Sequence, residues 1–124
     1  MREIKFRGMK DNDKGEWVYG YLTKTKRDYL IGENQDFMYW VKPETVGQFT
    51  GLNDRKGNPI YEGDILEDFD GEKWETITVK YDNGKFGAMF LGESTEEDLC
   101  EVCNRMTIVG NIYDNPELWE GEKL

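Results

Sequence analysis

Apolar and polar residues alternate over several short stretches of this chain, and each stretch predicts a β-strand with one buried face. Ile4 and Phe6 alternate with charged residues, and residues 17–22 repeat the pattern with aromatic side chains on one face. Residues 29–31 and 37–41 are short, and the second of these runs is rich in aromatic residues, which favours strands over helices. The first third of the chain is therefore expected to form hairpins of short strands.

The clearest alternation runs over residues 74–91 and is interrupted by Asn83 and Gly84. An Asn-Gly pair between two alternating runs is a strong signal for a β-hairpin with a tight turn. The apolar face of this hairpin needs a surface to cover. We therefore expect the hairpin to pack on the strand that begins at the corner of Gly63 and Asp64.

Residues 46–66 place turn-forming residues between two apolar runs. Asp54 is able to accept hydrogen bonds from nearby backbone amides, and Gly57 is free to take a positive φ angle. Pro59 withholds an amide donor, which suits the entry to an edge strand. We expect a hairpin or a compact loop here, followed by a corner at Gly63 and a further strand.

One helix is predicted at residues 95–104, because Ser94 or Thr95 can cap its start and an apolar stripe follows. The members of this stripe are Leu99, Val102, Cys103 and Met106. Asn115 and Pro116 have the sequence of a cap and a first helical residue, so a short terminal helix is expected after them.

These elements predict a mainly β fold, a small SH3-like or open β-barrel formed of hairpins, with one short helix in the last third of the chain. The length of 124 residues is that of one domain. Within this single domain we expect amino-terminal hairpins at residues 1–45, a central loop and barrel strands at residues 46–92, and a helix with a final strand at residues 93–124.

Three separated motifs carry a family resemblance: MREIKFRG at the start, GQFTGLNDRKGNPIYEGDI in the middle and VGNIYDNPELWE near the end. In this order they resemble the YopX family of small phage and prophage proteins. The resemblance covers most of the chain in outline and is weaker at residues 24–39 and 68–103. It implies a phage or prophage origin, a mainly β fold and self-association, and it supplies no catalytic residue to transfer to this chain.

The charge of the chain narrows the choice of partner. There are 16 Lys and Arg against 26 Asp and Glu, a net charge of −10, and no histidine. An acidic surface repels nucleic acid and attracts a basic protein. The lack of histidine removes the commonest general base and metal ligand near neutral pH.

Four Trp and seven Tyr exceed what a core of this size encloses, so some should remain exposed as interface residues.

Two alternatives to a binding function follow from charged clusters. A carboxylate- and metal-dependent enzyme would use Asp64, Asp68 and Asp70 as ligands, although their spacing matches no known template. A nucleic-acid-binding small barrel would use the basic residues at 24–27, which a solvated loop explains better. The Asp-x-Asp-x-Gly run at residues 11–15 lacks the glutamate of a calcium loop and predicts a turn.

Cys100 and Cys103 form a Cys-x-x-Cys pair inside the predicted helix. One such pair supplies half of a four-ligand zinc site, and no other cysteine or histidine completes it within one chain. A site shared by two chains, each giving both thiolates, remains the alternative. We interpret both residues as reduced thiols that face the core.

The sequence therefore predicts no catalytic, cofactor-binding or metal-binding residue. The expected function is that of a non-enzymatic phage or prophage accessory protein that binds a host or phage protein or a second copy of itself. Nucleic acid is not the expected partner. No window approaches the length of an apolar membrane span, and no signal peptide is seen, so a cytoplasmic location in the host cell is expected.

Overall fold

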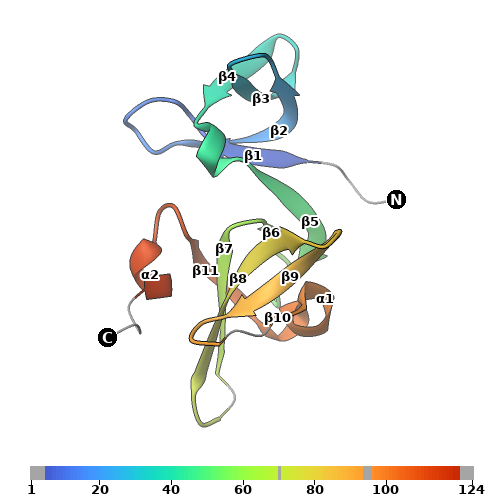
Figure 1. The fold of residues 1–124 in the computed structure, drawn as a ribbon, viewed down its shortest axis with the longest axis vertical. Helices are drawn as coiled ribbons and strands as arrows, with labels where there is room; N and C mark the ends of the chain where they lie inside the picture. Colours follow the sequence, from blue (N-terminus) through green and yellow to red (C-terminus); the bar gives the residue numbers. More distant parts are fainter. Residues whose placement is uncertain (1–4, 70, 94–95, 121–124) are drawn as a thin grey trace. The chain divides into compact units, whose positions relative to one another are not determined.

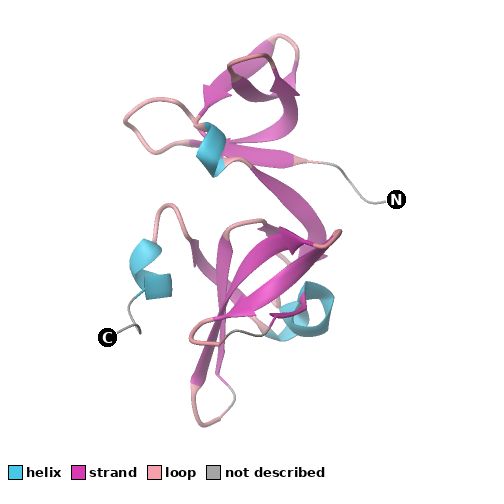
Figure 2. Ribbon diagram, viewed as in Figure 1, coloured by secondary structure: helices cyan, strands magenta, loops and turns pink. Residues whose placement is uncertain are grey.

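The structure is a computed structural model, and it describes residues 5–69, 71–93 and 96–120. Contacts divide the chain into two compact units, Met1–Phe49 and Thr50–Leu124. Strands dominate both units and the helices are short (Figure 2). The predicted mainly β character is confirmed. The single domain stays a prediction.

The first unit is an antiparallel sheet whose strands follow the order β4-β3-β2-β1 (Figure 1). A single 3-10 turn, η1 (Pro43–Thr45), leads into β5 (Gly47–Asn53), and the start of β5 pairs with β1. The Thr45 hydroxyl accepts a hydrogen bond from the Met9 amide at 2.9 Å and ties this turn to β1. Three predicted strands of this region are confirmed as β2 (Trp17–Lys24), β3 (Tyr29–Asn34) and β4 (Phe37–Val41). The strand predicted at Ile4 and Phe6 is observed from Phe6 onward as β1 (Phe6–Met9), and Ile4 lies outside the described residues.

The core of the first unit is small. Ile31 and Val41 are almost completely buried, and Met9 of β1 is buried as well. Gly8 lets these side chains approach the backbone, because a Cβ atom there would lie 3.0 Å from both Ile31 Cδ1 and Val41 Cβ. So few buried side chains leave most aromatic rings of this unit at the surface.

The second unit begins with the end of β5, which pairs with β6 (Pro59–Tyr61). An antiparallel sheet then follows in the order β10-β9-β8-β7-β11. The predicted hairpin turns at Asn83 and Gly84, which both have positive φ, and Ile77 on β8 lies opposite Leu66 on β7. The predicted packing of the hairpin on this strand is confirmed. The five strands are β7 (Asp64–Phe69), β8 (Trp74–Asp82), β9 (Lys85–Phe90), β10 (Glu96–Asp98) and β11 (Thr107–Asn111).

The apolar core of the second unit lies between this sheet and the segment that follows β10. The predicted stripe is confirmed, because its four members are buried. Each large apolar side chain buried in this way contributes about 1.5–3 kcal/mol to the stability of the folded state. The core residues are Ile60, Leu66, Ile77, Val79, Phe86, Ala88, Phe90, Leu99, Val102, Cys103 and Met106.

The predicted helix at residues 95–104 is wrong in its start and length. Only α1 (Leu99–Val102) is α-helical, and it continues as the 3-10 turn η2 (Cys103–Arg105). Residues 96–98 are β10, paired with β9, so sheet pairing takes the residues that a helix would have used first. The caps proposed at Ser94 and Thr95 lie outside the described residues. The predicted terminal helix is confirmed as α2 (Pro116–Glu120).

The structure also differs from the prediction of a small SH3-like or open β-barrel. In the described part of the chain the sheets are not closed into a barrel. The order of the five-stranded sheet leaves β10 and β11 as separate edges. The first of these edge strands has three residues, and the pairing of the second with β7 shifts register between Ile108 and Gly110.

Candidate functional site

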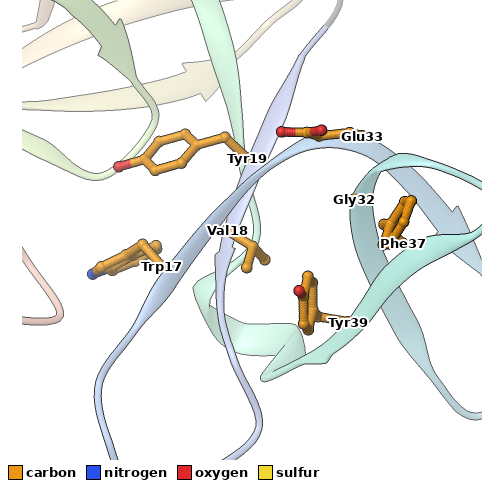
Figure 3. A pocket seen from close by; sticks show the side chains of 7 residues that line it. All are labelled: Trp17, Val18, Tyr19, Gly32, Glu33, Phe37 and Tyr39. Carbon is orange, nitrogen blue, oxygen red and sulfur yellow. The ribbon is translucent and has the colours of Figure 1, made fainter.

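A hollow of about 340 Å³ opens in the first unit, and aromatic residues line it (Figure 3). Phe37 and Tyr39 come from β4, and their side chains are 62% and 44% exposed. Val18 projects from β2 on the side of Tyr39, whereas Trp17 and Tyr19 project from the other side of the same strand (Figure 3). Gly32 and Glu33 of β3 complete the lining. The rings on β4 are therefore open to a ligand.

Two glycines allow the strands around this hollow to approach closely. A methyl group at Gly32 would overlap the carbonyl oxygen of Phe37 and lie 2.9 Å from the Cα atom of Met38. Gly20 has φ +148°, and a methyl group there would overlap the carbonyl oxygen of Gly32. Gly20 therefore permits a close approach of β2 to β3, and backbone atoms take the place of side chains beside the hollow.

Cations of the first unit lie over several of its aromatic rings, an arrangement that attracts a positive charge to the negative face of a ring. Lys10 is the nearest, with its Nζ atom 4.2 Å from the Tyr39 centroid and 3.7 Å from a Glu16 carboxylate oxygen. The other pairs are Arg7 over Trp17 at 4.9 Å, Lys24 over Tyr29 at 5.4 Å and Lys5 over Tyr19 at 6.0 Å.

A second hollow, of about 370 Å³, lies in the second unit beside the turn end of the β7-β8 hairpin. Phe69 and Trp74 contact each other there in a tilted arrangement, with ring centroids 5.2 Å apart, and they are 50% and 62% exposed. Arg105 holds the two strands beneath them, because its guanidinium lies 3.3 Å from both Asp68 and Glu75. Trp, Phe and Arg side chains on one surface are the composition of an interface hot spot.

The negative charge of the chain belongs almost entirely to the second unit. Residues 1–49 contain nine Lys and Arg against eight Asp and Glu, a net charge of +1. Residues 50–124 contain seven against eighteen, a net charge of −11. The averaged charge of −10 therefore describes the surface of the second unit and not that of the first.

The carboxylates proposed as metal ligands do not form one site. Asp64 is buried and accepts a hydrogen bond from the Tyr61 amide at 2.8 Å, so it stabilises the corner before β7. Asp68 pairs with Arg105. Four residues of extended strand place these two carboxylates about 13 Å apart, too far to share one ion. Asp70 lies outside the described residues.

The two cysteines differ in environment. Cys103 is buried in the core, as predicted, whereas Cys100 is exposed, which corrects the prediction that both thiols face the core. Cys100 lies near the carboxylates of Asp98 and Glu101. Asp98 is already paired with Lys85 at 2.6 Å, so this acidic cluster is explained by an ion pair.

We expect iodoacetamide to modify Cys100 at least about tenfold faster than Cys103 at neutral pH, since reactivity needs exposure and the thiolate form. Burial, together with the neighbouring Cys100, raises the pKa of Cys103. Peptide mass spectrometry of the alkylated protein measures both rates. Equal rates in the folded protein would contradict this assignment, and equal rates in urea serve as the control.

Asp54 is a buried carboxylate that organises the central stretch. One of its oxygens accepts hydrogen bonds from the amides of Lys56 and Asn58 at 2.9 Å each, which forms the predicted turn. The other accepts from the amide of Ile108 on β11 at 3.0 Å. Burial alone would raise the pKa of Asp54, but these hydrogen bonds outweigh it and hold the pKa below its ordinary value of 3.8.

This lowered pKa predicts a loss of stability in acid. The contribution of the Asp54 carboxylate is complete above pH 3.8, the ordinary value, and disappears as the pH falls through the lower pKa of the folded state. Urea unfolding of the wild type and of Asp54→Asn measures the effect. The stability difference between them should shrink below pH 3.8, and a difference that stays constant down to acid unfolding would contradict the assignment.

Sequence reasoning expected exposed aromatics but did not locate either hollow. The signals were present in the aromatic run at residues 37–41 and in the glycines of β2 and β3.

The described residues contain no helix that is long and apolar enough to cross a bilayer.

Comparison with known proteins adds a family and a fold. A family model described as YopX protein matches residues 3–120. No curated protein matches the chain. Among solved structures, the crystal structure of protein EF1440 from Enterococcus faecalis matches 97% of this chain and 100% of its own, with 23% sequence identity and a TM-score of 0.59. At this identity the likeness supports the fold alone.

Proposed function

We propose a binding function for this chain, which belongs to the YopX protein family: it is a non-enzymatic module that binds another protein or a second copy of itself. The observation that carries the proposal is the number of large aromatic side chains left exposed. They are Tyr19, Tyr21, Phe37, Tyr39, Trp40, Phe69, Trp74 and Tyr81. Exposed aromatic rings are costly in water and dominate the energetics of protein interfaces when they are buried by a partner.

Each unit has exposed rings of its own. In the first, the rings of β4 border a hollow, and in the second, Phe69 and Trp74 lie above Arg105. The chain has no histidine to act as a general base, and Asp64 and Asp68 are occupied with structural contacts. These features support binding over a carboxylate-dependent enzyme, which remains the alternative function.

We further propose a phage or prophage origin, which the family resemblance implies, and with it a location in the cytoplasm of the host cell. The partner would then be a host protein, a phage protein or a second copy of the chain. Nucleic acid is the competing partner for the first unit alone, because its net charge is +1 and lysines lie beside its rings.

Light scattering combined with a DNA-binding titration tests the proposal. We expect light scattering to give a mass above the 14.6 kDa of one chain, for the protein alone or for its mixture with a protein partner. We expect no retention of duplex or single-stranded DNA at moderate salt. A protein that stays monomeric and retains DNA as salt is raised would contradict it.

A further inference from the structure

We propose that the hollow of the first unit binds the cationic side chain of a lysine or arginine presented by the protein partner. This inference rests on the proposed binding function and gives it a chemistry. The hollow combines open aromatic rings with a free carboxylate, and these two groups together attract a cation. Neither group alone would identify the ligand.

The ring component is Phe37. Its side chain is 62% exposed and lines the hollow from β4. The neighbouring Tyr39 already carries Lys10, whose Nζ atom lies 4.2 Å from the ring centroid, so a ring of this strand accepts a cation within the same molecule. Phe37 has no such cation among the contacts of the described residues, which leaves its face available to one from outside.

The charged component is Glu33. It is exposed, it lines the same hollow, and within the described residues no lysine or arginine pairs with it. Lys10, the cation next to Tyr39, is held by Glu16 instead. Glu33 is the one charged residue that lines the hollow among the described residues.

The size and the wall of the hollow suit a long side chain. A volume of about 340 Å³ accepts an extended lysine or arginine side chain with part of its own backbone. Gly32 contributes backbone only, which leaves polar peptide groups beside the aliphatic part of the ligand. The first unit has a net charge of +1, so the local carboxylate of Glu33, and not the averaged charge of the chain, would attract the cation.

Backbone NMR titration tests the proposal with three small probes: N-acetyl-arginine amide, N-acetyl-lysine amide and the uncharged N-acetyl-citrulline amide. We expect saturable shifts of the Gly32, Glu33, Phe37 and Tyr39 amides with at least one cationic probe. The citrulline probe should bind about fivefold more weakly or worse, since it keeps the shape of arginine without the charge.

Matched variants separate the two components. Glu33→Gln and Phe37→Ala should each raise the dissociation constant about fivefold, whereas Phe37→Tyr, which keeps a ring, should stay within about twofold of wild type. Glu44→Gln, an exposed carboxylate of η1 outside the hollow, is the control and should change nothing. The dispersion of the same spectra shows that each variant is folded.

Equal binding of the citrulline probe, or unchanged binding by Glu33→Gln, would overturn the proposal in favour of an uncharged ligand. Stronger shifts with oligothymidylate than with either cationic probe would overturn it in favour of nucleic acid. The binding function itself is tested through Trp40 and Trp74, which do not line this hollow, so the two proposals fail separately.

Discussion

Replacing Asp54 with alanine is expected to lower the free energy of unfolding by about 3 kcal/mol, because a charged acceptor is removed and buried donors lose their partner. The Asp54 side chain accepts from three backbone amides, and one of these, on Ile108, lies 54 residues away in the chain. Its loss separates the central turn from β11. Urea unfolding followed by circular dichroism measures the change.

The control for this variant is Glu97→Ala, which removes an exposed carboxylate of β10 in the same unit. Surface substitutions of this kind change stability by about 0.5 kcal/mol or less. If Asp54→Ala costs no more than Glu97→Ala, then the hydrogen bonds of Asp54 do not hold the central turn in place.

Replacing Gly32 with alanine is expected to cost about 2–4 kcal/mol and to disrupt the pairing of β3 with β4, because the new methyl group meets backbone atoms that cannot rotate away. The nearest obstacles are the carbonyl group of Phe37 and the Cα atom of Met38. The hollow should lose its shape in the same variant. Urea unfolding and the amide spectrum of residues around β4 report both effects.

Gly15→Ala is the matched control in the same unit. Gly15 has φ +68° with open space around it, so alanine there meets conformational strain of about 1 kcal/mol and no clash. A Gly32→Ala variant as stable as Gly15→Ala would mean that β3 and β4 do not approach as closely as described.

Local patterns predicted the strands well. The alternation at residues 74–91 and the Asn-Gly turn specify both strands of the hairpin and its register, because a slip by one residue would expose the apolar face. The predicted helix was started too early, at residues that include Glu96–Asp98. These residues favour a helix locally, but they form β10 because they pair with β9. Propensity is a weak guide when a neighbouring strand offers hydrogen bonds.

The candidate site depended on information that no local pattern contains. The hollow forms where Gly32 meets the backbone at Phe37 and where Gly20 meets Gly32, and these approaches join different strands. Similarly, amides of the turn were predicted to donate to Asp54, but the hydrogen bond from the Ile108 amide joins distant segments. Sequence reasoning anticipated the residue types of both features and missed their partners.

The most direct test of the binding function is capture from a bacterial host lysate with wild-type protein and the double variant Trp40→Ser, Trp74→Ser side by side, after nuclease treatment. These two side chains are 61% and 62% exposed, so the variant should fold while losing its aromatic surface. A control with Lys26→Ser and Glu97→Ser changes exposed charges only.

The account predicts that wild type and control retain the same protein, or an untagged copy of the chain, and that the double variant retains about tenfold less of it. Equal retention by all three proteins, or a partner that disappears on nuclease treatment alone, would contradict a protein-binding function through exposed aromatic residues.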